Sequence, residues 1–244
     1  MPQELALKSK VAVITGGNRG IGFALAQAFV REGCDVVITG RDAKALKTAA
    51  ARLGKKKALP LACDITDPDQ VVKLFAAIKR RHSTLDILVN NAGIAHGLAP
   101  VEQLSVDGWK QVIDTNLTGM FLCTRAALPL MRAGGTIVNN LSVAATQPFE
   151  GMAAYNASKY GALGFTNVLR EELREREIRV LALIPGPTDT AIWDQFWKDA
   201  PRDKMVSPDT VAEVVLQAVK LPPNTTIEEI RMRPTIGSLR AQNS

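Results

Sequence analysis

Tyr155 and Lys159 are the residues of this 244-residue chain whose types and spacing first indicate chemistry. If the segment between them is helical, side chains four positions apart lie one above the other on the same face. An ammonium group that close favours the phenolate, so we expect it to lower the pKa of Tyr155 from about 10 towards neutral pH. Such a tyrosine can protonate a carbonyl oxygen or accept a proton from an alcohol. Because the pair can also arise by chance, the surrounding segments must supply its context.

A glycine-rich turn lies near the N-terminus. Residues 11–15 form a short apolar run, which is typical of a strand buried on both faces of a parallel sheet. Glycines recur from Gly16 to Gly22, and residues 23–30 have a helix-forming composition. A strand, glycine turn and helix in this order offer backbone N–H groups and a helix N-terminus to a pyrophosphate. The alternative, an ordinary tight turn, is disfavoured by the flanking strand and helix.

Two arginines indicate which dinucleotide would bind. In a dinucleotide-binding fold, an acid at the end of the second strand holds the 2′-OH of NAD. Here the predicted strand 35–40 is followed by Arg41, and Arg19 lies in the glycine turn. Two guanidinium groups favour a 2′-phosphate, although both could be plain surface arginines. Asp42 is better interpreted as the N-cap of a helix over 43–53.

The elements that must position these residues alternate along the chain. Further strands are predicted at 58–64, 85–90, 136–141, 178–184 and 226–232, and further helices at 67–81, 107–131, around Tyr155 to Glu177, and 207–220. Gly134 and Gly135 are expected to break the chain before the fifth strand. The alternation predicts the α/β class: a three-layer, doubly wound (Rossmann) fold with a parallel seven-stranded sheet, and one domain over 1–244.

Polar residues follow several of these strands. Asp64, Asn91 and Ser142 each stand at or after a strand end, and ligands bind at the carboxyl ends of strands in open α/β sheets. Asn116 lies in the middle of a predicted helix, where asparagine is a poor helix former. It could mark a kink with its side chain turned inward, or it could face solvent; the sequence leaves both open.

The segment 188–206 is predicted to be a substrate lid. It follows the helix and strand breakers Pro185, Gly186 and Pro187, and it carries the apolar residues Ile192, Trp193, Phe196 and Trp197. The alternative is a short amphipathic helix packed permanently on the body. The aromatic residues suggest an apolar or moderately polar carbonyl substrate, and no clear carboxylate clamp is visible, although His96 and Arg202 could lie near the mouth.

Composition excludes several classes of function. The net charge is +6, but the basic residues are scattered apart from the run at 55–57, so nucleic-acid binding has little support. Cys34, Cys63 and Cys123 are widely spaced and there are only two histidines, so no metal site is expected. Free thiols, the lack of a signal-peptide pattern and the lack of an apolar run of about 20 residues predict a cytoplasmic protein without membrane contact.

Taken together, these motifs resemble those of the short-chain dehydrogenase/reductase family, in its single-domain subclass, from about residue 10 to 233. Residues 15–22 match the pattern TGxxxGxG, residues 90–93 match NNAG, and residues 185–190 match PGxxxT. Asn116, Ser142, Tyr155 and Lys159 match the family's catalytic tetrad. Each match is weak alone, but their order and spacing make the set specific.

The resemblance implies a role for each matched residue. Tyr155 would be the general acid/base, Lys159 would lower its pKa and hold the nicotinamide ribose, Ser142 would bind the substrate carbonyl, and Asn116 would hold a water molecule. The cofactor-binding residues would be Gly16, Asn18, Arg19, Gly20, Ile21, Gly22, Arg41, Asp64, Ile65, Asn91, Ala92, Gly93, Pro185, Gly186, Thr188 and Thr190, with Tyr155 and Lys159. Basic residues at Arg19 and Arg41 would mark NADP(H) as the cofactor.

The expected activity is therefore reversible, NADP(H)-dependent reduction of a ketone or aldehyde, with a small-molecule substrate and a homodimer or homotetramer. Residues 222–234 lack the glycine-rich end of 3-oxoacyl-[acyl-carrier-protein] reductases and look more like the ends of 3-hydroxy acid dehydrogenases and broad-range carbonyl reductases. Arg132, Arg174 and Arg176 nevertheless offer a possible docking surface for an acyl carrier. The alternative function is a non-catalytic NADP(H) sensor; a sugar-nucleotide epimerase or dehydratase fits badly.

Overall fold

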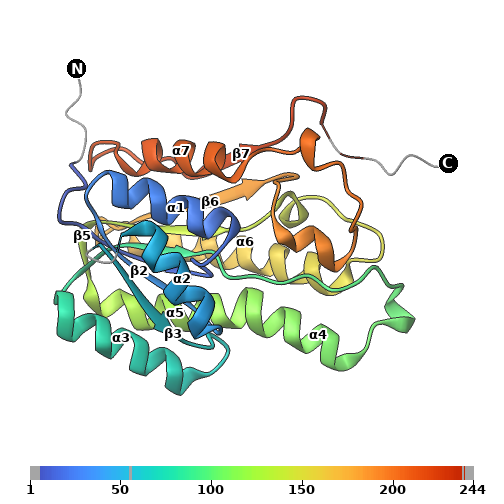
Figure 1. Cartoon of the computed structure of the whole chain (residues 1–244), viewed down its shortest axis with the longest axis horizontal. Coiled ribbons are helices and arrows are strands. Elements are labelled where there is room, and N and C mark those ends of the chain that lie inside the picture. The colour runs from blue at the N-terminus through green and yellow to red at the C-terminus, as the bar shows by residue number, and fades with distance from the viewer. Residues whose placement is uncertain (1–5, 55–56, 238, 240–244) are drawn as a thin grey trace.

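A computed structural model describes residues 6–54, 57–237 and 239 of the chain. Its centre is a seven-stranded sheet in the order β3-β2-β1-β4-β5-β6-β7, and every neighbouring pair is parallel (Figure 1). The strands are β1 (Val11–Thr15), β2 (Asp35–Gly40), β3 (Ala58–Ala62), β4 (Leu85–Asn90), β5 (Met131–Asn140), β6 (Arg179–Pro185) and β7 (Glu229–Met232). The predicted doubly wound fold is confirmed.

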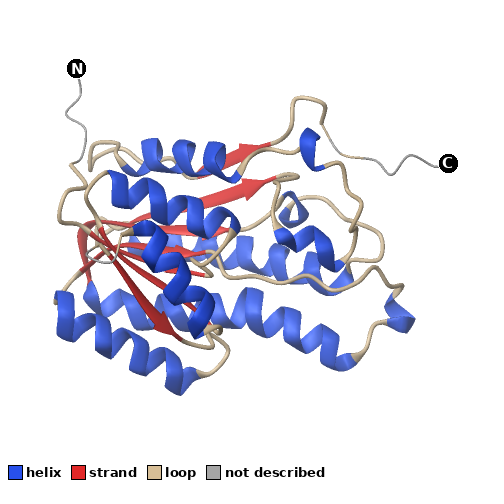
Figure 2. Cartoon of the chain, in the orientation of Figure 1, coloured by secondary structure: helices blue, strands red, loops and turns tan. Residues whose placement is uncertain are grey.

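Helices cover both faces of the sheet and complete the three layers (Figure 2). They are α1 (Gly20–Arg31), α2 (Ala43–Leu53), α3 (Pro68–His82), α4 (Val106–Ile113), α5 (Gly119–Ala127), α6 (Ala153–Leu173) and α7 (Pro208–Val219). Alternate residues of β1 point to opposite faces: Ala12 and Ile14 pack with α1, α2 and α7, whereas Val11 and Val13 pack with α3, α5 and α6. Because both faces are buried, the strands read as continuous apolar runs.

Local sequence signals set several helix ends. The side chain of Asp42 accepts hydrogen bonds from the backbone N–H groups of Lys44 and Ala45 at 2.9 and 3.0 Å, so it caps α2 as expected. Asp67 caps α3 in the same way, with Pro68 in the first turn. Of the basic run at 55–57, Lys57 pairs with Asp35 at 2.9 Å, and the other two lysines lie outside the described residues.

The helix predicted over 107–131 is interrupted. Between α4 and α5 lies a single π-helical turn, Asp114–Thr118, and a 3-10 turn at Leu128–Leu130 follows α5. Asn116 sits in the π-helical turn and is 1% exposed. The inward-facing interpretation of Asn116 is therefore confirmed and the solvent-facing one is wrong. A π-helical turn adds one residue to the helix, which rotates that residue towards its neighbours, and such turns are frequent at functional sites.

Other element boundaries also differ from the prediction, among them the end of β3, which lies at Ala62 rather than at residue 64. Strand β5 begins at Met131, so Gly134 and Gly135 lie inside it; Gly134 takes a φ of +82°, and the pairing with β4 shifts register there. Helix α6 ends at Leu173, and a turn leads on to Glu177 at a φ of +52°. Strand β7 comprises only the last four residues of the predicted 226–232. In the described part of the chain, no helix is long and apolar enough to cross a membrane.

Candidate active site

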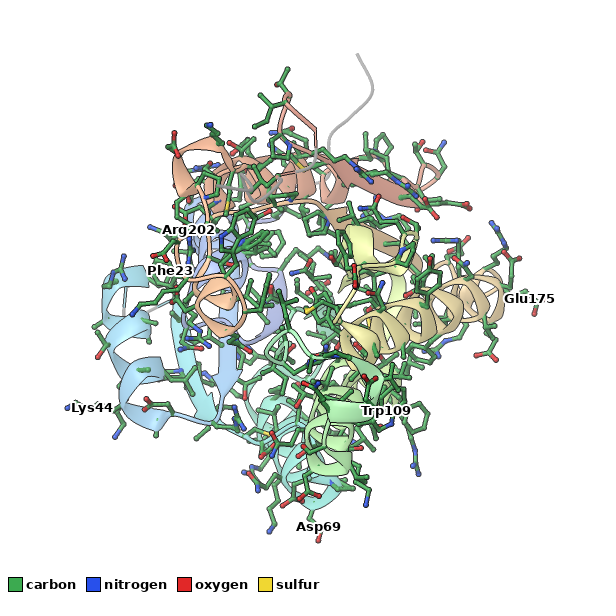
Figure 3. The ribbon with its side chains drawn as sticks, turned by 90° about the vertical axis from the view of Figure 1, so that its right-hand side faces the viewer. Phe23, Lys44, Asp69, Trp109, Glu175 and Arg202 are labelled. Atoms are coloured by element: carbon green, nitrogen blue, oxygen red, sulfur yellow. The ribbon has the colours of Figure 1, made fainter. Side chains whose placement is uncertain are left out.

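A cleft of about 590 Å³ opens at the carboxyl ends of the strands. Figure 3 views the molecule from this side, and Figure 1 shows the segment after β6 lying at the same edge. Among the predicted site residues, those lining the cleft are Gly16, Asn18, Arg19, Gly20, Ile21, Arg41, Asp64, Ile65, Asn91, Ala92, Gly93, Ser142, Tyr155, Lys159, Pro185, Gly186, Thr188 and Thr190. Asn116 and Gly22 are the two predicted residues that do not line it.

The glycine turn between β1 and α1 forms one wall of the cleft. Gly16 and Gly20 adopt φ values of +65° and +55°, which other residues rarely take. A Cβ at Gly20 would lie 3.1 Å from Cγ2 of Thr190, so this turn packs closely against the start of the segment 188–206. A Cβ at Gly22 would lie 2.4 Å from Nδ2 of Asn91. The lack of a side chain at Gly22 therefore allows α1 to pack against the loop after β4.

Tyr155 and Lys159 lie on the first turns of α6, and Ser142 lies two residues after the end of β5. The Nζ atom of Lys159 is 5.7 Å from the centre of the Tyr155 ring. The lysine side chain is buried, and its ammonium donates a hydrogen bond to the backbone carbonyl of Asn140 at 3.1 Å. The predicted i, i+4 arrangement is thus present, with Ser142 and Tyr155 close enough to hydrogen-bond.

Asn116 lies behind this group. Its Oδ1 accepts from the backbone N–H of Ile94 at 2.9 Å, and its Nδ2 donates to the Ile94 carbonyl at 2.9 Å and to the Ser158 hydroxyl at 3.0 Å. A Cβ at Gly93 would lie 3.3 Å from Oδ1 of Asn116 and 3.7 Å from Nζ of Lys159. Asn116 therefore joins the loop after β4 to α6 within a few ångströms of the Lys159 ammonium.

The pKa values in this group correct the expectation for Tyr155. Burial raises the pKa of Tyr155 above its ordinary value, and the hydrogen bond with Ser142 opposes this shift. Burial lowers the pKa of Lys159 from 10.5 to about 8. Burial of Tyr155 thus outweighs its hydrogen bond with Ser142, and the pKa of Tyr155 is raised where a fall was predicted.

A short hydrogen-bond chain connects the glycine turn with Lys159. The side chain of Asn91 donates to the backbone carbonyl of Thr15 at 2.9 Å, and Asn140 donates to Oδ1 of Asn91 at 2.8 Å. The carbonyl of Asn140 then accepts from Lys159. Asn140 lines the cleft but was not predicted, although its place at the end of β5 follows the same rule that identified Ser142.

The segment 188–206 carries an aromatic cluster. The Trp193 ring centre is 5.0 Å from that of Phe196 and 5.9 Å from that of Trp197, and the Trp193 indole donates to the carbonyl of Thr188 at 2.9 Å. The predicted apolar residues Ile192, Trp193, Phe196 and Trp197 all line the cleft. Their side chains form an apolar part of its wall.

His96 and Arg202 are not among the residues that line this cleft. Arg202 donates to the carboxylates of Asp189 and Asp194 at 3.2 and 2.6 Å, so its charge is used within the segment 188–206. Arg202 and Phe23 (both labelled in Figure 3) line a second cavity, to which the glycine turn also contributes. The charge of Arg202 is thus committed to Asp189 and Asp194, and its place near the mouth of the main cleft stays a prediction.

Several residues of the cleft lie outside the predicted motifs. The unpredicted residues near the catalytic group include Ile94, Leu98, Val143, Gln147, Phe149, Glu150, Met152, Gln195 and Arg233. Most have no spacing or type that distinguishes them in the sequence. Arg233 is different, because it directly follows the last strand and could have been found from its place at a carboxyl end.

The cleft has the features that an anionic dinucleotide needs. Its glycine turn leaves room at Gly16, where a Cβ would come within 3.0 Å of Ala92, and the α1 N-terminus lies beside it. Arg19 and Arg41 line the same end of the cleft, whereas the neighbouring Asp42 carboxylate caps α2. Among the described residues, no group of three or more His, Cys, Asp or Glu side chains could hold a metal ion.

Comparison with known proteins agrees with this geometry. The family model described as short chain dehydrogenase matches residues 10–201. The chain is 34% identical over 238 residues to serine 3-dehydrogenase of Agrobacterium fabrum, covering 93% of this chain and 94% of that protein.

Two solved structures extend the comparison to three dimensions. A closed form of serine dehydrogenase complexed with NADP+ superposes with a TM-score of 0.87 at 29% identity, covering 96% of this chain and 98% of that one. A 3-ketoacyl-(acyl-carrier-protein) reductase of Brucella melitensis complexed with NADH superposes with a TM-score of 0.84 at 31% identity, covering 92% and 97%.

Proposed function

The chain belongs to the short-chain dehydrogenase/reductase family, and on that premise we propose that it is an NADP(H)-dependent enzyme that reduces a ketone or aldehyde to an alcohol, reversibly. The observation that carries the proposal is the grouping of Tyr155, Lys159 and Ser142 in one cleft with the glycine turn. Each group matches a need of carbonyl reduction: a proton donor, a cation and a hydroxyl that can bind the carbonyl oxygen.

The cofactor would be held by the glycine turn and by the two arginines beside it. Backbone N–H groups of the glycine turn would receive the pyrophosphate, and Arg19 and Arg41 would pair with the 2′-phosphate through charge-assisted bonds. When bound, NADPH supplies the hydride. The serine dehydrogenase structure contains NADP+, which supports NADP(H) as the cofactor. The reductase structure contains NADH, so the choice between the two cofactors rests on Arg19 and Arg41.

The chain's own residues would handle the proton. The Ser142 hydroxyl would donate to the substrate carbonyl oxygen, and the Tyr155 hydroxyl would transfer its proton to that oxygen as the alcohol forms. The raised pKa of Tyr155 keeps the hydroxyl protonated in the reducing direction. Asn116 would hold the neighbouring loop and the start of α6 in register, so that the Lys159 ammonium stays beside the reacting group.

Two further features belong to the proposal. Residues 188–206 act as the lid, with their aromatic cluster closing over the substrate. A cytoplasmic location is compatible with the three cysteines, which are buried free thiols.

An acyl carrier as the substrate is less favoured, because Arg174 pairs with Glu171 and Glu228 and Arg176 donates to the Leu128 carbonyl.

The test is an NADPH-oxidation assay on varied ketones and aldehydes, with NADPH binding measured separately by calorimetry. We expect NADPH to bind and at least one class of carbonyl compound to be reduced. Tight NADPH binding without turnover of any compound would contradict the enzymatic role and would favour the sensor alternative.

A further inference from the structure

The segment between β5 and α6 carries Ser142 and part of the cleft wall. Ser142 precedes a single 3-10 turn, Val143–Ala145, and the chain then runs without regular structure to the start of α6 at Ala153. Gln147 and Phe149 of this segment line the cleft together with Ser142. Because an irregular segment has no ladder of its own to fix it, other contacts must hold the Ser142 hydroxyl at a constant position relative to Tyr155.

Asn156 supplies such contacts. It follows Tyr155 directly on α6, and its side chain is half-buried. Its Nδ2 donates to the backbone carbonyls of Ala144 and Gln147 at 2.9 and 2.8 Å, and its Oδ1 accepts from the N–H of Phe149 at 3.1 Å. Both amide hydrogens and one lone pair of the oxygen are therefore used. One side chain thus holds the segment to the first turn of α6 at three points.

The Ala144 residue links Asn156 to the catalytic hydroxyl. Its carbonyl accepts from Asn156, and its N–H donates to Oγ of Ser142 at 3.1 Å. A serine hydroxyl has one proton to donate and two lone pairs with which to accept. The N–H of Ala144 occupies one lone pair, so the proton of Ser142 stays available to Tyr155, with which Ser142 hydrogen-bonds, or to a substrate carbonyl.

These contacts form a closed ring around the two hydroxyls. Tyr155 joins Asn156 through the backbone, and hydrogen bonds then join Asn156 to Ala144 and Ala144 to Ser142. The ring closes where Ser142 meets Tyr155. A shift of the turn relative to α6 would break at least one of these bonds, so Asn156 helps to fix the distance between the two catalytic side chains.

We propose that Asn156 is a positioning residue, which orients the Ser142 hydroxyl towards the carbonyl oxygen of the substrate by holding Ala144. This inference rests on the proposed function, in which Ser142 binds that oxygen. Asn156 is not among the residues that line the cleft, so it acts through Ser142 rather than on the substrate. A donor must lie close to its productive position to stabilise charge that develops in the transition state, so loss of Asn156 should lower kcat more than it raises KM.

The test is a double-mutant cycle between Asn156 and Ser142, with NADPH as the reductant and benzaldehyde, cyclohexanone and ethyl acetoacetate as the probes. Asn156→Leu removes all three hydrogen bonds and keeps a branched side chain. Asn156→Asp keeps the acceptor for Phe149 but loses the donor to Ala144. Ser142→Ala removes the hydroxyl through which Asn156 would act.

The matched control is Asn167→Leu. Asn167 lies on the same helix with an exposed side chain, and it accepts from Arg170 at 3.1 Å. Calorimetry with NADPH shows for every variant whether the cofactor site is intact. Hydrogen exchange of the Ala144 N–H measures how firmly the turn is held, independently of turnover.

With Ser142 present, Asn156→Leu and Asn156→Asp should each lower kcat by about 10–100-fold, with NADPH binding retained. With Ser142→Ala in place, the same changes should lower kcat by no more than about threefold, because the group that Asn156 orients is already gone. The Ala144 N–H should exchange faster in both Asn156 variants, and Asn167→Leu should behave as the wild type.

Three results would overturn the inference. They are an equal fall in kcat with and without the Ser142 hydroxyl, full activity in Asn156→Asp, and an unchanged exchange rate of the Ala144 N–H in Asn156→Leu. In each case turnover by the wild type leaves the proposed function standing. If the wild type reduces no ketone or aldehyde, both proposals fail.

Discussion

Lys159 is a buried cation, and its burial has a cost in folding free energy. Its pKa falls from 10.5 to about 8 in the folded protein, so the unfolded chain binds more protons between those values. At pH 7 the full cost is present, and it disappears as the pH rises from about 8 to 10.5. A residue kept at such a cost is consistent with selection for activity rather than stability.

We therefore expect Lys159→Met to abolish turnover and yet to raise the free energy of unfolding at pH 7 by about 1–3 kcal/mol. The gain over the wild type should shrink as the pH rises towards 10.5. Chemical denaturation of both proteins at pH 7 and pH 10 measures this difference. A variant that is less stable at pH 7, with no dependence on pH, would show that the ammonium stabilises the fold.

A substitution of Arg41 tests whether the cofactor is NADP(H) rather than NAD(H). Replacing it with Asp removes a cation that would meet the 2′-phosphate and adds an acid that suits a free ribose hydroxyl. We expect the KM for NADPH to rise by at least about tenfold while that for NADH falls or stays level. Lys44→Gln is the control, because Lys44 lies close by on α2 but points away from the cleft (Figure 3). Equal KM values for NADPH before and after the Arg41 change would refute the assignment.

At the scale of elements, the strands next to the cleft were predictable from the sequence because they are buried on both faces. The continuous apolar runs gave the observed bounds of β1, β2 and β4. The glycine turn, the cap at Asp42 and the position of Ser142 after a strand end followed from local rules. These are features in which a short stretch of sequence decides its own structure.

Other elements depend on contacts that a local pattern does not contain. The π-helical turn at Asn116 is held by bonds to Ile94 and Ser158 from other segments, and β5 starts early because Met131 pairs with Leu85 of β4. The pKa of Tyr155 was misjudged for the same reason, since burial by the whole fold raises it. Arg233 lines the cleft because it directly follows β7, whose pairing with β6 no motif records.

At the scale of the whole molecule, an apolar surface extends over α4, α5 and α6. Trp109, Phe121, Tyr160 and Val168 are 41%, 43%, 46% and 58% exposed, and Trp109 projects from α4 in Figure 3. The rings of Phe121 on α5 and Phe165 on α6 meet edge to face at 6.2 Å, so the two helices share one surface. Exposed apolar side chains gathered on neighbouring helices are typical of an interface between proteins.

We expect the protein to be a homodimer or homotetramer through this surface, and the double change Phe121→Glu with Val168→Glu to shift it to a monomer of 26.3 kDa. Light scattering after size exclusion measures the mass. Val72→Glu is the control, because Val72 is 63% exposed on α3, which is not one of the three helices that carry this surface. A monomeric wild type, or an assembly unaffected by the double change, would place the interface elsewhere or exclude it.

The central claim is that the hydroxyl of Tyr155 transfers the proton during carbonyl reduction, and Tyr155→Phe tests it most directly. Tyr160→Phe is the matched control, since Tyr160 lies on the same helix with its ring exposed. Turnover with NADPH should fall by about 10²–10⁴-fold in Tyr155→Phe, with NADPH binding retained, and should be unchanged in Tyr160→Phe. Near-normal turnover in Tyr155→Phe would contradict the account.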